Sequence, residues 1–334
     1  MPCLDDLSKA RLDRRAALGL AAVAAFLAAR RAAVAQGAGA TGFPSQMVRL
    51  IVPFSAGSMT DILARSLAEK LRERWRQQVI VENRPGIAGT GGVARSAPDG
   101  LTLMLTSNGH TVIRSVNREV TFDPVKDFTA IAKVASMPSI MVAPAEGDIK
   151  TLNDLIAAAK AKPGQLNYGS AGLGSSTGIA AELFRHVTGT RMQLVPYRGM
   201  PESQTSVLRG DSVFCFTFFN VGGDLIQAGR LRALAVTGAS RMRQLPDVPT
   251  FREAGLADFD YDAWFGVMAP AGLPAALTRQ IAADIAASLG DADIRTRFAE
   301  QGVDLVTTTP AAFTAEIAAD AERYGPLVRQ AAGG

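Results

Sequence analysis

Two segments of the chain combine glycine, alanine and serine with the start of a helix, each directly after a strand-like run. The first reads Pro-Phe-Ser-Ala-Gly-Ser-Met-Thr-Asp over residues 53–61, and the second reads Tyr-Gly-Ser-Ala-Gly-Leu-Gly-Ser-Ser-Thr-Gly over residues 168–178. Free backbone N–H groups in such loops, beside a helix N-terminus, bind an anion without a cationic side chain. For one loop, a turn with a helix cap is the simpler interpretation. For two loops, a clamp for an anionic ligand explains the pattern equally well.

Acidic side chains beside these loops have ordinary structural explanations. Asp61 opens a helix, where a carboxylate interacts favourably with the helix N-terminus, and a contact with a ligand or a water is the alternative. Glu182 and His186 lie four residues apart on one expected helix, a spacing that favours a surface pair over a catalytic dyad.

Motifs of common enzymes and metal sites are missing from the sequence. The second segment contains Gly172-Leu173-Gly174 but lacks the third glycine of a dinucleotide-binding loop, because residue 177 is threonine. Ser170 directly follows Gly169, unlike the serine of a nucleophile elbow, and no G-x-x-x-x-G-K-[ST] loop occurs. The chain has two histidines and no Cys/His cluster. We therefore expect no enzymatic activity, no cofactor and no metal.

Strand-like and helix-like segments alternate along the chain. Short β-branched or apolar runs predict strands at 48–53, 79–81, 101–105, 131–134, 140–143, 166–170, 193–197, 213–218, 231–237 and 303–306. Helices are predicted at 61–75, 151–160, 176–187, 203–209, 225–228, 274–289, 292–301 and 310–330. This alternation is typical of α/β proteins with largely parallel sheets. Such sheets bind ligands at the carboxyl ends of their strands, which is where both glycine-rich segments lie.

The first 35 residues are typical of an export signal. A basic segment ends in Arg14-Arg15, residues 16–29 are uncharged and rich in alanine, and residues 33–35 form a small-x-small cleavage pattern. The uncharged run is shorter than the roughly 20 residues that cross a bilayer. The arginine pair resembles a twin-arginine signal, and an ordinary Sec signal is the alternative. We expect cleavage after Ala35 and a periplasmic product.

Most of the excess basic charge lies in this leader. The chain has 35 Lys and Arg residues against 31 Asp and Glu residues, a net charge of +4. Six of these basic and three of these acidic residues fall within residues 1–35, so 29 basic and 28 acidic residues follow. No Lys/Arg block remains, and aromatic residues are only 6% of the chain, so we expect no nucleic-acid partner. Cys215 is the sole cysteine after the leader and is expected to be buried.

The two loops belong to a set of eight segments that follow one another along the chain. They are residues 48–61, 81–86, 97–100, 168–176, 195–199, 228–236, 245–250 and 264–270, and they include Val-Glu-Asn-Arg-Pro-Gly at 81–86 and Leu-Pro-Asp-Val-Pro-Thr at 245–250. With this ordered set the chain resembles the substrate-binding proteins of tripartite tricarboxylate transporters, also called Bug-type or TctC-type receptors. The resemblance covers residues 45–330 approximately.

The resemblance implies an α/β fold of the type II periplasmic binding proteins, in which two lobes close on a ligand. Each lobe is then expected to contain a central mixed, largely parallel sheet. The chain should cross between lobes near 142–147 and 264–270, which gives a first lobe of 44–144 plus 268–334 and a second lobe of 145–267. The resemblance further implies a small carboxylate ligand and the membrane subunits of a tripartite transporter as partners. We expect a monomer.

The same resemblance places the carboxylate between the two loops. The implied ligand-binding residues are Phe54, Ser55, Ala56, Gly57, Ser58 and Asp61 in the first loop, Ser170, Ala171, Gly172, Gly174 and Ser175 in the second, Ser107 and Tyr197 nearby, and Thr217 and Phe218 on the strand at the far end of the ligand. The chain departs from the family at Ser58 and Met59, at Gly178 where a histidine is frequent, and at Thr217-Phe218, where the family frequently has Asp-Asn. This last exchange removes a carboxylate and adds aromatic surface. We therefore expect a ligand less polar than an amino-dicarboxylate, such as an aromatic or branched carboxylate.

Two other functions remain as alternatives at this point. A receptor that presents its ligand to a signalling partner would have the same sequence features as a transport receptor. An exported hydrolase would use Ser170 or Ser175 as its nucleophile, but neither histidine has an evident place beside these serines.

Overall fold

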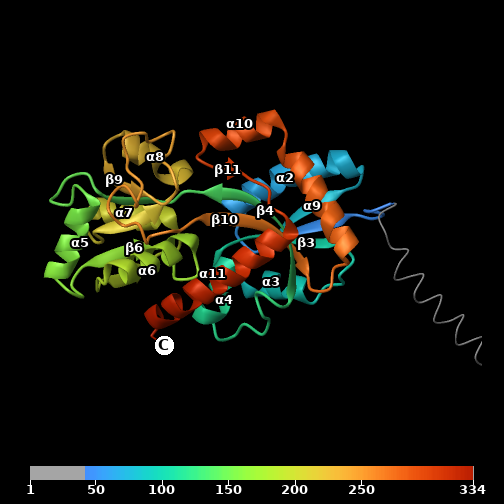
Figure 1. Cartoon of the computed structure of the whole chain (residues 1–334), viewed down its shortest axis with the longest axis horizontal. Coiled ribbons are helices and arrows are strands. Elements are labelled where there is room, and N and C mark those ends of the chain that lie inside the picture. The colour runs from blue at the N-terminus through green and yellow to red at the C-terminus, as the bar shows by residue number, and fades with distance from the viewer. Residues whose placement is uncertain (1–41, 334) are drawn as a thin grey trace, which may run out of the picture. The chain divides into compact units, whose positions relative to one another are not determined.

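The computed structural model describes residues 42–333. The expected export signal at 1–35 and its cleavage position at Ala35 lie outside the described residues. Within the described part, no helix is long and apolar enough to cross a membrane. Residues from Pro44 onward form one compact unit, and Figure 1 labels most of its strands and helices.

The first sheet is assembled from widely separated parts of the chain. In the described residues it has six strands in the order β11-β4-β10-β3-β1-β2. Their bounds are β1 Val48–Val52, β2 Val79–Asn83, β3 Thr102–Ser107, β4 Phe128–Met137, β10 Ala263–Pro270 and β11 Asp304–Leu305. β1 is parallel to β2 and β3, whereas β10 is antiparallel to β3 and β4. The sheet is therefore mixed, and the carboxyl ends of β1 and β3 meet at one edge.

Amphipathic helices cover this sheet. They are α2 Met59–Trp75, α3 Ile87–Ala94, α4 Gly109–Val116, α9 Ala275–Leu289, α10 Ala292–Glu300 and α11 Pro310–Ala331. Helix α2 buries Leu63, Leu67 and Leu71, which recur at the spacing that predicted it. Its N-terminus follows the first glycine-rich loop directly, so packing of this helix on the sheet determines where that loop lies.

The second sheet repeats this arrangement. In the described residues its order is β7-β6-β8-β5-β9. Its strands are β5 Ile140–Pro144, β6 Asn167–Ser170, β7 Gln193–Pro196, β8 Phe214–Thr217 and β9 Leu231–Val236, and its helices are α5 Leu152–Ala161, α6 Ser176–Thr188, α7 Met200–Arg209 and α8 Phe219–Gln227. β6 is parallel to β7 and β8, and β5 is antiparallel to β8 and β9. The expected α/β class with a mixed sheet in each lobe is confirmed. The sheets are not largely parallel as expected, because three of the five described strand pairings in the first sheet and two of the four in the second are antiparallel.

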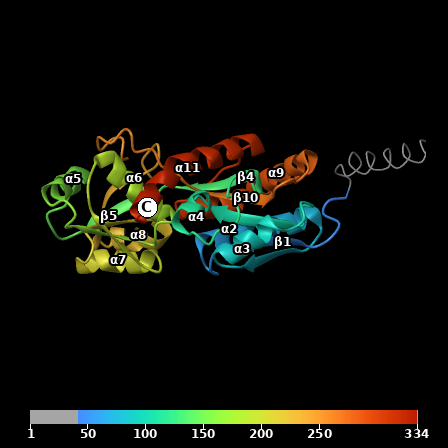
Figure 2. The same ribbon diagram turned by 90° about the horizontal axis from the view of Figure 1, so that it is seen from below.

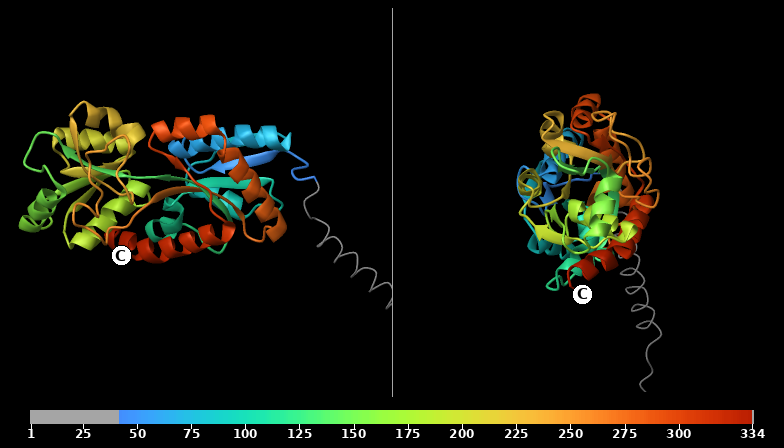
Figure 3. Two further views of the ribbon diagram at one scale, coloured as in Figure 1. Left: turned by 45° about the horizontal axis from the view of Figure 1, so that its top comes forward. Right: turned by 90° about the vertical axis from the view of Figure 1, so that its left-hand side faces the viewer.

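The chain passes between the sheets at two places (Figure 3). The first passage is Pro138–Ser139, between β4 in the first sheet and β5 in the second, and the second precedes Ala263, where β10 begins. The expected crossings near 142–147 and 264–270 lie later in the chain. The difference arises because β5 already pairs with β8 and β9, and because β10 pairs with β4 over its whole length. We propose lobe boundaries at these two passages.

Each sheet has an aromatic core. Trp264 and Phe313 meet edge to face with ring centroids 4.9 Å apart under the first sheet, and Phe216, Phe251 and Phe259 stack under the second. Gly266 on β10 has no room for a side chain, because a Cβ there would lie 2.1 Å from Cζ of Phe313. The large rings and the glycine therefore fix how α11 approaches β10.

Three elements were absent from the sequence prediction. Helix α3 reads Ile-Ala-Gly-Thr-Gly-Gly-Val-Ala, so its glycines obscure both helix propensity and periodicity. Helix α4 has eight residues and begins at a glycine. Strand β10 is buried at every position, and a continuous apolar run has no period of two that would reveal a strand.

The C-terminal helix α11 contacts helices of both lobes. It packs on α4 of the first lobe and on α6 of the second. Figure 2 shows α11 beside α4, with its C-terminal end close to α6. The helix therefore joins the element after β3 to the element after β6, and these two elements carry the site described next.

Candidate functional site

The first loop joins β1 to α2. Its residues are Phe54 and Ser58, which are half-buried, and Ser55, Ala56 and Gly57, which are exposed. Ser58 caps α2, because its Oγ accepts a hydrogen bond from the Asp61 N–H at 3.2 Å. Gly57 has φ +81°, a left-handed conformation that favours glycine. Within the described residues, the N–H groups of Ser55 and Ala56 have no intramolecular partner.

The buried carboxylate of Asp61 fixes the conformation of this loop. The carboxylate is 3% exposed and accepts hydrogen bonds from Gly57 N–H at 2.9 Å, Asn83 Nδ2 at 3.0 Å and Arg65 Nε at 3.0 Å. Burial alone would raise the pKa of Asp61, but the bonds from Arg65, Gly57 and Asn83 lower it below its usual value. Asn83, at the end of β2, also donates to the Phe54 carbonyl at 3.2 Å. Both carboxylate oxygens are therefore occupied by the protein itself.

The second loop joins β6 to α6 and is built in the same way. Ser175 caps α6 by accepting from Gly178 N–H at 3.0 Å, and its hydroxyl donates to the Gly172 carbonyl at 2.7 Å. Ser170 is 1% exposed, Ala171 and Gly172 are half-buried, and Gly174 is exposed. Within the described residues, the N–H groups from position 171 to position 174 have no intramolecular partner. A histidine at position 178 would not fit this loop, because a Cβ there would lie 2.1 Å from the Gly172 carbonyl oxygen.

A third strand-to-helix junction, which the sequence analysis did not single out, lies between the two loops. Asn108 follows β3 and is completely buried. Its Nδ2 donates to the Tyr261 hydroxyl at 2.8 Å, and its Oδ1 accepts from Ser176 Oγ at 2.5 Å. Tyr261 in turn donates to the Ser176 carbonyl at 2.5 Å. One buried amide therefore joins the first lobe, the segment before β10 and the N-terminus of α6.

A glycine of the first lobe is in close contact with a glycine of the second lobe at this junction. A Cβ on Gly109, the first residue of α4, would lie 2.2 Å from the Gly174 carbonyl oxygen of the second loop. Phe54 of the first loop, Gly109 and Gly174 line one cavity of about 120 Å³. The structure thus brings the two glycine-rich loops together around the N-terminus of α4.

The other implied residues lie at neighbouring strand ends. Ser107 ends β3 and is 6% exposed, and Tyr197 follows β7, where its N–H donates to the Ser170 carbonyl at 2.8 Å. Thr217 is completely buried and its hydroxyl accepts from Gln204 Nε2 at 2.5 Å. Phe218, at the N-cap of α8, is 5% exposed. Thr217 and Phe218 do not line the cavity between Phe54 and Gly174.

Glu182 is not the surface residue that the sequence analysis expected. It is 5% exposed, accepts the Tyr168 hydroxyl, and binds Arg185 Nη1 at 2.6 Å, whereas His186 is exposed. Burial raises the pKa of Glu182, and Tyr168 and Arg185 oppose that rise. The expected surface pair with His186 is therefore wrong, because Glu182 is buried beside Tyr168 and Arg185 whereas His186 is exposed. Cys215 is buried, as expected.

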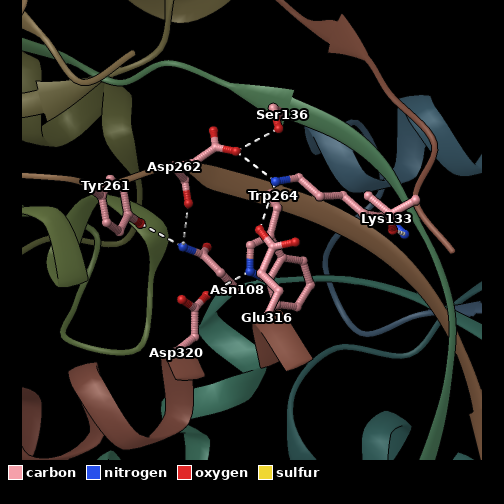
Figure 4. A network of polar contacts seen from close by, with 9 residues as sticks. Asn108, Lys133, Ser136, Tyr261, Asp262, Trp264, Glu316 and Asp320 are labelled. Carbon is pink, nitrogen blue, oxygen red and sulfur yellow. Dashed lines mark hydrogen bonds and ion pairs between the residues drawn. The ribbon is translucent and has the colours of Figure 1, made fainter. Parts of the chain in front are cut away.

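A network of polar side chains supports the strand that passes between the lobes (Figure 4). Lys133 on β4 donates at 2.7 Å both to Asp262, just before β10, and to Glu316 on α11. Ser136 donates to Asp262 at 2.6 Å. Burial lowers the pKa of Lys133, but the two carboxylates outweigh burial and raise it. The segment that carries Tyr261 is thereby fixed to the first lobe.

A second carboxylate contacts the same strand from α11. Asp320 accepts the Trp264 indole N–H at 2.7 Å. Burial raises the pKa of Asp320 to about 6, and nearby Glu316 adds to this, while Trp264 and Lys133 oppose it.

Larger cavities lie away from both loops. One of about 740 Å³ is lined by Arg243, Arg295 and Glu300, and another of about 630 Å³ is lined by Arg241 and Asp260, among others. Neither is lined by a described residue of the glycine-rich loops. Volume alone would place a ligand there, but the loops that carry the free N–H groups meet at the smaller cavity, which Phe54 and Gly174 line.

Comparison with known proteins agrees with this geometry. Residues 63–332 match the family model described as the tripartite tricarboxylate transporter family receptor. The protein BugT of Bordetella pertussis is 32% identical over 318 residues, which is 93% of this chain and 96% of that protein. A protein from the tcbD-tcbE intergenic region of Pseudomonas sp. (strain P51) is 32% identical over 290 residues, 86% of each chain.

Solved structures share the whole fold. An R. palustris protein determined with adipate is 31% identical with a TM-score of 0.75, and the match covers 87% of this chain and 98% of that one. MatC from Rhodopseudomonas palustris, determined with bound malate, is 27% identical with a TM-score of 0.74, covering 86% and 100%. The expected two-lobed periplasmic-binding-protein fold is confirmed by these structures and by that of the periplasmic binding protein BugD. The chain therefore belongs to the family of tripartite tricarboxylate transporter receptors.

Proposed function

We propose that this protein captures a small carboxylate between its two glycine-rich loops and delivers it to the membrane subunits of a tripartite transporter. The observation that carries the proposal is the set of unpartnered N–H groups at Ser55, Ala56 and positions 171–174, on loops that meet at one cavity. Adipate and malate in two related structures support a carboxylate as the ligand class. The family supports a periplasmic location, an export signal at 1–35 and a transporter as partner.

Neutral donors are sufficient for such a ligand. A hydrogen bond to a charged group contributes roughly 1.5–3 kcal/mol. Several of these bonds, after the entropy lost on capture and closure, leave the roughly −8 kcal/mol of a micromolar receptor. No Lys or Arg lines the described cavity, so release of the anion to a transporter leaves no buried cation unpaired.

Both candidate nucleophiles are engaged in the structure of the second loop. Ser175 Oγ caps α6 and contacts Thr177 Oγ1 at 3.1 Å, while the Ser170 hydroxyl is directed to the Gly172 carbonyl at 3.4 Å. His186 is exposed on α6, and the His110 ring binds the Pro124 carbonyl through Nε2 at 2.8 Å. These contacts support a binding role over hydrolysis. We further propose that the receptor is a monomer.

The far end of the ligand is proposed to be less polar than an amino-dicarboxylate. Thr217 stands where the family frequently has an acidic residue, and its hydroxyl is already bound by Gln204. Thr217 does not line the cavity between the loops, whose walls at Phe54, Ile113 and Val116 are apolar as well. A branched or aromatic carboxylate fits these surroundings better than a second charged group.

The test is a thermal-shift screen of mono-, di- and tricarboxylates on the protein purified from the periplasm, followed by calorimetry on the best ligand. A ligand at a hundred times its Kd adds about 2.7 kcal/mol to the free energy of unfolding, which is readily visible. Stabilisation by at least one carboxylate, without turnover of it, is the expected result. No response to any carboxylate would contradict the proposed function. Loss of uptake of that ligand on deletion of the gene distinguishes transport from sensing.

A further inference from the structure

The two lobes also touch at the end of α10, away from the glycine-rich loops. Gln244, in the segment that follows β9 of the second lobe, donates from Nε2 to the Ala299 carbonyl oxygen of the first lobe at 2.5 Å. A carbonyl oxygen only accepts, so the amide nitrogen of Gln244 is the donor. Ala299 lies in the last turn of α10, where carbonyl oxygens lack their regular helical partners. The hydrogen bond therefore joins a donor of one lobe to the negative end of a helix of the other.

Apolar side chains of the second lobe pack beside this hydrogen bond. Gly302, which follows α10, has φ +75°. A Cβ there would lie 3.0 Å from Met242 Cε and 3.0 Å from Phe219 Cβ, so the glycine lets the first lobe approach both side chains closely. Phe219 is the first residue of α8, and Figure 1 shows α8 and α10 next to each other, one on each lobe. Gln244, Met242 and Phe219 together are named the clasp.

Each half of this contact is anchored in its own lobe. Met242 and Leu245, on either side of Gln244, are buried in the apolar core of the second lobe. In the first lobe, Phe298 of α10 is buried, and its carbonyl oxygen accepts the Val303 N–H at 3.0 Å, which fixes the turn that contains the glycine. The two halves therefore move with their lobes, and a rotation of one lobe against the other separates them.

Gln244 lies apart from the loops that carry the free N–H groups. Gln244 and Ala299 line both the cavity of about 740 Å³ and the cavity of about 630 Å³, and no described residue of the two loops lines either. Phe219 connects the clasp to the site, because α8 begins at the carboxyl end of β8, and β8 is parallel to β6, which carries the second loop. The clasp is also formed in the same arrangement of the lobes in which Gly109 meets Gly174.

We propose that the clasp sets the ligand affinity of the receptor from outside the ligand site, with Gln244 as a positioning residue. A contact that exists only where the two loops meet stabilises that arrangement over any in which the lobes are rotated apart. The apparent Kd of a ligand that needs both loops rises in inverse proportion to the population of that arrangement. Loss of the clasp therefore weakens binding without changing any ligand contact. The effect on affinity rests on the proposed function, whereas the effect on the arrangement of the lobes needs no ligand.

Substitutions at Gln244 test the donor by calorimetry on the protein purified from the periplasm. The probes are adipate, malate, citrate and phenylacetate, and the tightest binder is used for every variant. Gln244→Leu removes the donor at similar size and should raise the Kd about fivefold. Gln244→Lys keeps a donor that suits the negative end of α10, so its Kd should stay within about twofold of wild type. Gln227→Leu and Gln227→Lys, at an exposed residue of α8, are the matched controls and should bind like wild type.

The arrangement of the lobes is measured by pulsed electron paramagnetic resonance between two spin labels. Glu69→Cys on α2 and Arg209→Cys on α7 place one label on an exposed position of each lobe, while Cys215 is buried. Without ligand, Gln244→Leu should broaden the distance distribution relative to wild type and to Gln244→Lys. A purely structural role would lower the free energy of unfolding and leave the distribution unchanged.

The two measurements separate the clasp from the proposed function. Distance distributions and affinities of Gln244→Leu that equal those of wild type would overturn the clasp and leave the function intact. A Gln244→Lys variant that binds as weakly as Gln244→Leu would contradict the role of the donor. If wild type binds no carboxylate, the proposed function fails, and the distance distributions alone decide whether the clasp sets the arrangement of the lobes.

Discussion

Asp61 and Asn83 fix the conformation of the first loop without being ligand contacts themselves. Their side chains occupy the Gly57 N–H and the Phe54 carbonyl, and so set the backbone of the first loop from its inner side. The outer N–H groups of Ser55 and Ala56 remain free. From its position in the sequence, Asp61 could be either a helix-start carboxylate or a ligand contact. The geometry supports the first role, because Arg65, Asn83 and Gly57 use both oxygens.

Replacement of Asp61 by asparagine is expected to disorder the first loop. The new amide places a donor where Arg65, Asn83 and Gly57 all donate, so unfolding free energy should fall by about 1–3 kcal/mol and ligand affinity should drop. Glu69→Gln, on the exposed side of the same helix, is the control and should change neither. Urea denaturation and calorimetry measure the two effects. Wild-type affinity in Asp61→Asn would contradict this role.

The contribution of Asp61 to stability depends on pH, and its pKa in the folded protein gives the sign. Its pKa in the folded protein lies below the ordinary aspartate value of 3.8, so the carboxylate contributes stability that is complete above that pH. This contribution is lost as pH falls from near 4 through the folded pKa. The stability difference between wild type and Asp61→Asn should therefore shrink in acid, as measured by denaturation between pH 7 and pH 3. A difference that stays constant over that range would show that ionisation of Asp61 does not carry its effect.

Helix N-termini are the elements that form the site. Helices α2, α4 and α6 each follow a strand that has a parallel neighbour, and the start of α4 meets the loop before α6 where the two lobes touch. The sequence predicted α2 and α6 because their apolar residues recur with helical period and a serine caps each. It missed α4, which has eight residues and no side-chain cap. The role of Asn108 depends on contacts with Tyr261 and Ser176, far away in the sequence, and no local pattern reveals such contacts.

Alanine at Gly109 is expected to prevent the loops from approaching. A Cβ there would lie 2.2 Å from the Gly174 carbonyl oxygen, so the contact between the start of α4 and the second loop cannot form unless the second loop moves. Ligand affinity should fall by tenfold or more, while each lobe keeps its fold. Gly92→Ala on α3 is the matched control, because a Cβ there meets nothing within 4 Å and alanine favours the helix. Calorimetry that finds equal affinities for the two variants would contradict the role of this contact.

At the scale of the whole molecule, α11 and β10 connect the two lobes. Helix α11 packs on α4 and α6, and the network of Lys133, Asp262 and Glu316 fixes the segment before β10. The two-sheet architecture could be predicted from the alternation of elements together with the family resemblance. The network could not, because its members come from β4, the loop before β10 and α11, and their meeting depends on the completed fold.

The contribution of Asp320 to stability depends on pH with the opposite sign to that of Asp61. Its pKa is raised from 3.8 to about 6, so between these values the folded state binds more protons than the unfolded state and stability falls as pH rises. The groups around it are Trp264, Glu316, Lys133 and Arg323. Asp320→Asn keeps an acceptor for Trp264 and removes the buried charge. It should raise the free energy of unfolding at pH 7.5 relative to wild type by about 1–3 kcal/mol and have less effect at pH 4. An equal change at both pH values would contradict the raised pKa.

The position of the bound carboxylate is the most direct test of the account. A crystal structure with the best ligand from the carboxylate screen should place one carboxylate within hydrogen-bond distance of the free N–H groups at Ser55, Ala56 and positions 171–174. The predicted site contains no Lys or Arg. A ligand bound instead in the cavity of about 740 Å³, with its carboxylate paired to Arg243 or Arg295, would contradict the central claim that backbone N–H groups of two loops capture the anion.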